Sequence, residues 1–184
     1  MLTAAGVAHE VQPARVDEEA VTAGLVAAGA SPARVADALA EVKAVKVSQG
    51  TPGALVLGAD SVLVAADGAL LTKPETLQAA AVQLQRLAGT THRLISAAVM
   101  AENGAAVWRR AGEAQLTMRG LSNGFIADYL SAEGEAVLGC VGSYRIEGLG
   151  AQLFMRIEGD QFVIRGLPLL AVLDYLRVRR VLAS

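Results

Sequence analysis

Two long strand-like runs near the middle of the chain constrain its fold most. Residues 93–102 and 105–118 both read as strands, and Asn103-Gly104 lies between them. This dipeptide favours a two-residue turn whose backbone twist matches that of the flanking strands. The sequence therefore predicts a β-hairpin over this stretch.

Helical patterns alternate with short apolar runs in the first half of the chain. Helices are predicted over residues 18–28, 32–50 and 75–87, the second one capped by Ser31 with Pro32 in its first turn. Residues 54–64 form an apolar run without helical period, which is typical of a buried strand. Together with the hairpin, this order predicts an α/β fold with a mixed, twisted sheet flanked by helices and opened by a cleft. The 184 residues suggest one domain, 1–184.

The remaining predictions are local. Residues 1–6 read as the end of a helix and 9–16 as a short strand, and Ser122 caps a helix that ends near residue 132. Residues 153–157 and 162–164 are predicted to pair as strands. The last helix follows Pro168, with Leu169, Leu170, Leu173 and Leu176 turned inward.

Composition excludes several classes of protein. With 53% hydrophobic and 18% charged residues, the chain is not mainly disordered. The net charge of -2 provides no basic field for nucleic acid, and no apolar run is long enough to span a membrane. The single Cys140 excludes an intramolecular disulfide and a Cys-rich zinc site, which favours the reducing cytoplasm.

Asp60 is the strongest single indication of function. It interrupts the apolar run at residues 54–64. A carboxylate in such a run is costly to bury unless it is paired or binds a cation. The alternative is that Asp60 caps a turn.

Other polar residues can be read in two ways. Lys73, held before Pro74, suits a phosphate at a helix entrance, but an exposed loop lysine is the more common case. On the 32–50 helix, Lys46 lies nearer the apolar stripe than Lys43, and spacing does not choose between them. Asp17 and Glu18 suit a helix N-terminus without any function, although with Asp60 they could hold a divalent ion.

His9, His92 and Cys140 carry no clear chemistry. The two histidines are far apart in the sequence and lack ligand spacing, so we expect each to be structural or exposed. Cys140 lies among glycines without a histidine partner, which favours a buried thiol over a nucleophile.

Read in order, several short motifs resemble the Maf family of nucleoside triphosphate pyrophosphatases, relatives of the inosine triphosphatase fold. Each motif alone is weak, but their order covers nearly the whole chain. The motifs are Val16-Asp17-Glu18, Leu39-Ala40-Glu41-Val42-Lys43-Ala44, Gly58-Ala59-Asp60-Ser61, Lys73-Pro74, Leu87-Ala88-Gly89-Thr90-Thr91-His92, Gly142-Ser143-Tyr144-Arg145-Ile146-Glu147-Gly148-Leu149-Gly150, Ile157-Glu158-Gly159-Asp160 and Gly166-Leu167-Pro168.

The resemblance implies a reaction and a set of roles. Water would attack the α-phosphorus of a nucleoside triphosphate and release the monophosphate and pyrophosphate, with Mg²⁺ or Mn²⁺ as cofactor. The implied roles are Asp60 as general base and metal ligand, Glu18 as the acid near the metal, Lys43 and Lys73 as phosphate-binding lysines, and Ser61 and Glu147 as base-selecting residues.

The resemblance also implies partners and a subgroup. Glu147 and Cys140 favour the branch that acts on 7-methyl-GTP, whereas Ser61 is closer to the dTTP/UTP branch. A homodimer and a link to septum formation are implied as well. The alternatives are a non-catalytic nucleotide-binding regulator of cell division and a phosphatase that releases orthophosphate.

One departure from the family pattern lies at the N-terminus. Family members begin with a strand and a phosphate-binding loop of the form Ser-x-Ser-Pro-Arg-Arg, whereas Met1-Leu2 aligns with the end of the helix that follows this loop. The sequence thus suggests a start codon assigned too late or a shortened protein, and a true loss of the loop would weaken catalysis.

Overall fold

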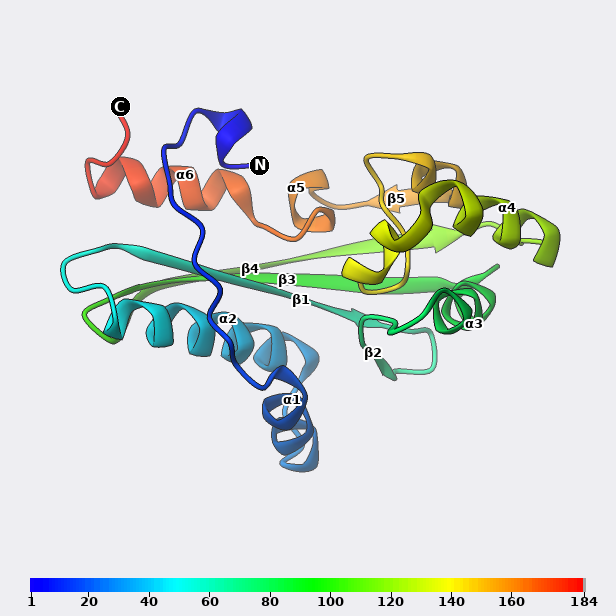
Figure 1. The fold of residues 1–184 in the computed structure, drawn as a ribbon, viewed down its shortest axis with the longest axis horizontal. Helices are drawn as coiled ribbons and strands as arrows, with labels where there is room; N and C mark the ends of the chain where they lie inside the picture. The colour runs from blue at the N-terminus through cyan, green and yellow to red at the C-terminus, as the bar shows by residue number, and fades with distance from the viewer. Residues whose placement is uncertain (184) are drawn as a thin grey trace. The chain divides into compact units, whose positions relative to one another are not determined.

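The computed structural model describes residues 1–183, which form two compact units. The first unit comprises Met1–Asp60, Ser96–Gly112 and the segment from Gly166 onward, and the second comprises Ser61–Ile95 and Glu113–Arg165. Five strands form one sheet in the order β2-β1-β3-β4-β5 (Figure 1). They are β1 (Val56–Val64), β2 (Leu70–Leu71), β3 (Thr91–Glu102), β4 (Ala105–Met118) and β5 (Phe154–Glu158). The predicted α/β class, with a sheet flanked by helices, is confirmed.

The strand pairs whose register is described are antiparallel, so neither of them shows the parallel pairing that the predicted mixed sheet would contain. Leu63 of β1 lies opposite Leu71 of β2, and Leu116 of β4 lies opposite Ile157 of β5. The predicted hairpin joins β3 to β4, with φ of 51° at Asn103 and 81° at Gly104. Positive φ at both turn residues is the conformation that the Asn-Gly dipeptide favours.

The described part of the first unit contains four helical segments. They are η1 (Thr3–Ala5), α1 (Glu18–Ala27), α2 (Pro32–Gln49) and α6 (Leu169–Val178). The predicted cap of α2 is confirmed, because the Ser31 hydroxyl accepts a hydrogen bond from the Arg34 N–H. In Figure 1, α2 and α6 lie on opposite faces of the strands of this unit.

Small side chains bring α2 close to β1. Ala40 and Ala44 are fully buried on the inner face of α2. A Cβ at Gly58 of β1 would lie 2.3 Å from the Ala40 carbonyl oxygen and 2.7 Å from the Ala44 nitrogen. Only a glycine fits at Gly58 without displacing the helix backbone.

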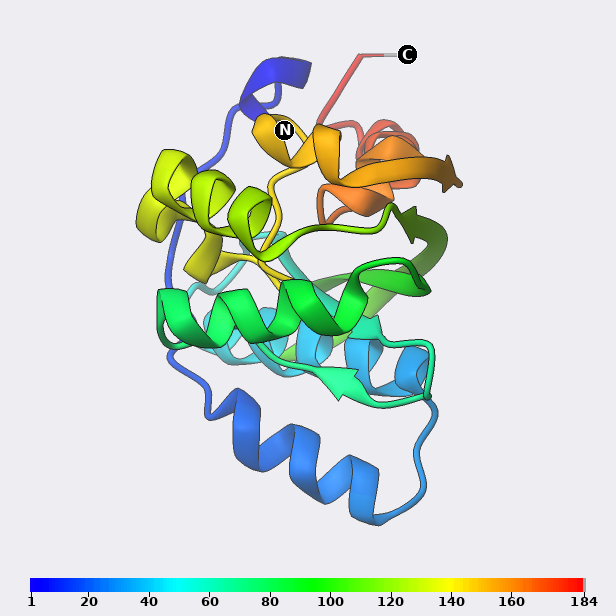
Figure 2. The ribbon, with the colours of Figure 1, turned by 90° about the vertical axis from the view of Figure 1, so that its right-hand side faces the viewer.

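The second unit is built from α3 (Leu77–Leu87), α4 (Asn123–Glu133), η2 (Gly134–Gly139), η3 (Leu149–Leu153) and α5 (Gln161–Ile164), with the strand segments of this unit. Helices α3 and α4 lie side by side (Figure 2). The core of this unit includes fully buried side chains from helices and strands, among them Leu63, Leu84, Leu87, Leu116, Met118 and Leu153.

Three local predictions were wrong. Residues 9–16 form no strand, and Val11 within them is 86% exposed, so no apolar face holds this segment to a sheet. The predicted pairing of residues 153–157 with residues 162–164 is wrong, because β5 pairs with β4 and residues 161–164 form α5 instead. The Asp160 side chain caps that turn by accepting a hydrogen bond from the Phe162 N–H. In α6, Leu169 and Leu176 are buried, but Leu170 is exposed.

Within residues 1–183, no helix combines the length and the apolar character that crossing a lipid bilayer requires.

Candidate functional site

Asp60 lies in β1, as predicted, with its side chain only 10% exposed. The strand residues that follow it, from Val62 to Val64, are buried and apolar. A carboxylate in this setting needs a cationic or hydrogen-bonding partner to remain ionised.

That partner is Lys43. Its Nζ lies 2.5 Å from Asp60 Oδ1 and 2.8 Å from Glu18 Oε1, so one ammonium joins two carboxylates. The three residues come from α2, β1 and the first residue of α1, all within the first unit. Three of the residues that the family resemblance singled out are therefore in direct contact.

The electrostatics of this cluster keep Lys43 protonated. Burial by itself would lower the pKa of the Lys43 ammonium, but hydrogen bonds and charge from Asp60 and Glu18 outweigh burial and raise this pKa above its ordinary value of 10.5. Lys43 is therefore a fixed cation at neutral pH, which suits an anionic ligand.

The expectation that Lys46 lies nearer the apolar stripe than Lys43 was wrong. Lys46 is exposed, and its Nζ donates a hydrogen bond to the Arg15 carbonyl oxygen at 2.5 Å. The buried stripe is centred on Ala40 and Ala44, which places the Lys43 side chain at the edge beside Asp60.

Asp17 and Glu18 have different roles. The Asp17 side chain accepts a hydrogen bond from the Ala20 N–H at 2.9 Å and so caps α1. This confirms the structural interpretation for Asp17, whereas Glu18 contacts Lys43.

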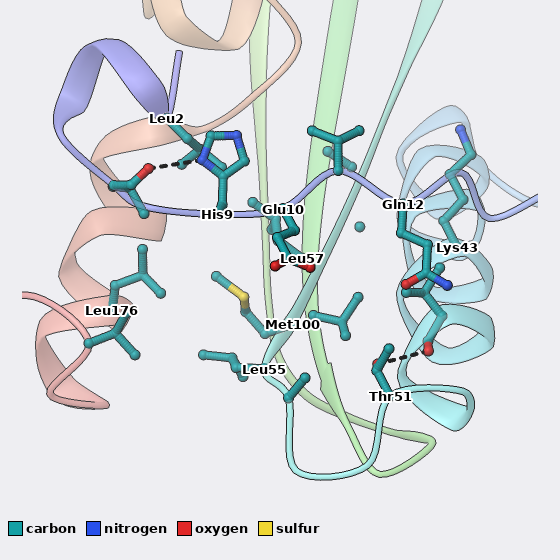
Figure 3. Close-up of a pocket in the computed structure, with 18 of the residues that line it drawn as sticks. Leu2, His9, Glu10, Gln12, Lys43, Thr51, Leu55, Leu57, Met100 and Leu176 are labelled. Atoms are coloured by element: carbon teal, nitrogen blue, oxygen red, sulfur yellow. Dashed lines mark hydrogen bonds between the residues drawn. The ribbon is translucent and has the colours of Figure 1, made fainter.

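A cavity of about 630 Å³ borders the cluster within the first unit. Its lining includes Lys43 and several apolar side chains, among them Leu55, Leu57, Met100 and Leu176 (Figure 3). Figure 3 shows the stem of Lys43 along the cavity, with its nitrogen pointing away from Leu55 and Met100. A mainly apolar lining does not suit a polyanion.

The other three predicted site residues belong to the second unit. Ser61 follows Asp60 in β1, Lys73 is exposed before α3, and Glu147 is exposed between η2 and η3. The charges of Lys73 and Glu147 both act on the Cys140 thiol. Burial, followed by the charge of Glu147, raises the pKa of the Cys140 thiol, while Arg145 and Lys73 act in the opposite direction. A raised pKa agrees with the expectation that Cys140 is not a nucleophile.

Sequence reasoning missed a group of side chains that holds the segment around Glu147. Glu133 accepts a hydrogen bond from the Leu149 N–H at 2.9 Å and forms an ion pair with Arg145 at 3.0 Å. Tyr129, four residues earlier on α4, accepts a hydrogen bond from the Arg145 N–H at 3.3 Å. The only available signal was the spacing of Tyr129 and Glu133, which places them on one helix face.

The histidines are structural or exposed, as expected. His92 is buried in the second unit, where its Nε2 lies 3.0 Å from the Tyr144 hydroxyl oxygen. Burial lowers the pKa of His92 to about 4, so the ring is neutral at physiological pH. His9 is exposed, and its Nδ1 lies 2.9 Å from the Val7 carbonyl oxygen.

Comparison with known proteins places these residues in a family. The sequence profile described as "Maf-like protein" matches residues 1–179. The chain belongs to the Maf-like family. The resemblance predicted from the short motifs is thereby confirmed.

Curated Maf-like relatives carry functional names. A protein of Sphingopyxis alaskensis named nucleoside triphosphate pyrophosphatase is 54% identical over 96% of this chain and 89% of its own length. One of Paramagnetospirillum magneticum with the same name is 51% identical over 96% of this chain and 91% of its own. A Brucella abortus protein named 7-methyl-GTP pyrophosphatase is 46% identical over 96% of this chain and 88% of its own.

Proposed function

We propose that this Maf-like protein is a nucleoside triphosphate pyrophosphatase, which hydrolyses its substrate to a nucleoside monophosphate and pyrophosphate. The observation that carries the proposal is the Lys43 ammonium between the Asp60 and Glu18 carboxylates. The similarity to relatives that bear this name supports it.

In the proposed reaction, Asp60 acts as the general base. A carboxylate within hydrogen-bond reach of a water can orient it and accept its proton as the oxygen attacks the α-phosphorus. Burial of Asp60 limits competition from solvent, and the contact with Lys43 fixes the direction of the carboxylate.

Lys43 and Lys73 are proposed to bind phosphate oxygens. An α-phosphorus is shielded by negative oxygens, so positive groups must stabilise the charge before water approaches. The raised pKa of Lys43 supports this role, because the group stays cationic throughout the physiological range. Lys73 is exposed and precedes Pro74, which restricts the backbone next to it.

Glu18 and Asp60 are proposed to hold a divalent cation, Mg²⁺ or Mn²⁺. Among residues 1–183, no group of three or more His, Cys, Asp or Glu side chains is arranged to hold a metal ion by itself. Two carboxylates nevertheless fit Mg²⁺, which is commonly bound by one or two carboxylates together with substrate phosphates. When bound, such an ion neutralises phosphate charge and polarises the phosphoryl group.

For the base, we propose a preference for 7-methyl-GTP or a related non-standard nucleotide, with Ser61 and Glu147 as the selecting residues. An exposed carboxylate at Glu147 can accept hydrogen bonds from a purine edge. Relatives named 7-methyl-GTP pyrophosphatase support this choice. A dTTP/UTP preference is the alternative.

We further propose a cytoplasmic homodimer linked to septum formation. These assignments follow from the family resemblance and, for the compartment, from the single Cys140. Light scattering on the purified protein tests the dimer directly, since a monomer mass would contradict it.

The decisive experiment is an assay of the purified protein with a panel of nucleoside triphosphates and Mg²⁺ or Mn²⁺. Pyrophosphate release is expected, and orthophosphate release would indicate a phosphatase instead. Asp60→Asn should lower kcat by about 10²- to 10⁴-fold, the usual contribution of a general base. Asp174→Asn, which changes a 76% exposed acid on α6, is the matched control. Nucleotide binding without turnover in the wild-type protein would favour the non-catalytic regulator.

A further inference from the structure

The segment that carries Glu147 is held in a defined shape within the second unit. It runs from Arg145 to Leu149, and the Gly148 N–H donates a hydrogen bond to the Arg145 carbonyl oxygen at 3.1 Å. This bond closes a tight turn, and Glu147 lies on the exposed side of it. The contacts that fix this turn therefore also fix the position of the Glu147 carboxylate.

Glu133, at the C-terminal end of α4, contacts both ends of this turn. Its Oε2 lies 3.0 Å from Arg145 Nη1, and its Oε1 accepts a hydrogen bond from the Leu149 N–H at 2.9 Å. The Glu133 side chain is only 5% exposed, against 37% for Arg145. A buried carboxylate with two such partners restrains the residues between them.

Glycines allow the approach of the turn to Glu133. A Cβ at Gly148 would lie 2.7 Å from Glu133 Oε1, and a Cβ at Gly150 would lie 2.3 Å from the Arg145 carbonyl oxygen. The absence of a side chain at Gly148 is therefore a condition for the contacts of Glu133, and its absence at Gly150 lets the chain pack against the Arg145 backbone.

Tyr129 supports the same segment from one helical turn earlier. Its hydroxyl donates to the Ser143 carbonyl oxygen at 3.4 Å and accepts from the Arg145 N–H at 3.3 Å. Tyr129 is 4% exposed. Helix α4 thus restrains the chain at Ser143, Arg145 and Leu149, on both sides of Glu147.

We propose that Glu133 is a positioning residue for base selection, which fixes the Arg145–Leu149 turn so that Glu147 meets the nucleobase in one orientation. This inference rests on the proposed pyrophosphatase function. Both carboxylate oxygens of Glu133 are engaged by Arg145 and Leu149, so Glu133 acts through the turn and not on the substrate directly. Its loss should therefore change discrimination between bases and leave the chemistry at the phosphates nearly unaltered.

The test compares kcat and KM for 7-methyl-GTP and dTTP in the wild type and in Glu133→Gln and Glu133→Ala. The glutamine keeps an acceptor for the Leu149 N–H but removes the charge opposite Arg145, and the alanine removes both. Glu135→Ala, two residues away on η2 and exposed, is the matched control. Thermal unfolding shows that each variant is folded.

Glu133→Ala should reduce the ratio of kcat/KM for 7-methyl-GTP to kcat/KM for dTTP by about tenfold, mainly through KM. The reason is that the Glu147 carboxylate, which is proposed to select the base, is no longer held in place. Glu133→Gln should give a smaller reduction, and Glu135→Ala none. Hydrogen exchange at the Leu149 amide should accelerate in Glu133→Ala alone.

An unchanged ratio of kcat/KM for 7-methyl-GTP to kcat/KM for dTTP in Glu133→Ala would overturn the inference. An equal loss of kcat on both nucleotides in the two Glu133 variants would overturn it as well. Either result would leave the pyrophosphatase proposal standing. A wild-type protein that releases pyrophosphate from no nucleotide would overturn the proposed function, and this inference with it.

Discussion

Gly58 lies so close to Ala40 that the β1 and α2 backbones are in contact: a Cβ at Gly58 would be 2.3 Å from the Ala40 carbonyl oxygen. Gly58 and Asp60 share one face of β1, since side chains alternate along a strand. The contact therefore sets how near Asp60 comes to Lys43, which lies one turn beyond Ala40 on α2.

Gly58→Ala should separate the two backbones and weaken both stability and activity. Because the added methyl group meets backbone atoms that cannot rotate away, we expect a loss of roughly 1–3 kcal/mol in the free energy of unfolding, typical of overpacking. Urea unfolding measures it. Gly24→Ala on α1, where a Cβ meets nothing within 4 Å, is the control and should be neutral or mildly stabilising. Wild-type stability in Gly58→Ala would contradict this account.

Lys43→Met and Lys46→Met form a matched pair on one helix. The Lys43 substitution removes the cation that we propose to bind phosphate and leaves two carboxylates facing one another, so kcat/KM should fall on the order of 10²-fold or more. Lys46 donates to the Arg15 carbonyl oxygen, and its substitution should leave kcat/KM nearly unchanged. Steady-state kinetics decide, and equal losses in the two variants would remove the special role of Lys43.

The ion pairs of Lys43 should also appear in the alkaline stability of the protein. The pKa of Lys43 is raised in the folded protein, so its contribution is fully present below pH 10.5 and is lost as pH rises through the folded pKa. The difference in unfolding free energy between wild type and Lys43→Met should therefore shrink only above about pH 10.5. A difference that already shrinks between pH 7 and 9 would argue against a raised pKa.

His92 should make the folded state sensitive to acid. Burial lowers its pKa from 6.5 to about 4, so the unfolded chain binds a proton more readily than the folded protein between these values. Stability should fall as pH drops from 6.5 to 4 and lose roughly 3 kcal/mol through this group. His92→Phe should flatten the dependence of unfolding free energy on pH between 6.5 and 4, measured by urea unfolding at several pH values. The substitution also removes the hydrogen bond to the Tyr144 hydroxyl, which lowers stability at every pH. His9→Gln, an exposed site, should keep the wild-type slope.

Much of the fold could be predicted because its signals are local. Ser31 and Ser122 cap helices where expected, and Asn103 and Gly104 turn the hairpin, since each depends only on its immediate neighbours. Residues 161–164 were misassigned because Asp160 starts a helical turn that an apolar run of this length does not reveal.

The site was predictable in part for a related reason. Asp60 could be recognised because it is an acid among apolar neighbours. The choice of Lys43 over Lys46, in contrast, depends on the rotation of α2 about its axis. That rotation is set by the tight contact at Gly58, which links positions distant in the sequence. The contacts of Glu133 with Arg145 and Leu149 also join separate parts of the chain, and the spacing of Tyr129 and Glu133 on one helix face does not reveal what that face contacts.

Helix α1, which supplies Glu18, has no buried residue, whereas Asp60 is anchored in the sheet. The two carboxylates on Lys43 are therefore unequal partners: Glu18 is held by little more than a partly exposed ion pair, an interaction of about 1 kcal/mol or less. An incoming anion that competes for the Lys43 ammonium would displace Glu18 first. Lys43 would then bind the anion while its contact with Asp60 stays intact.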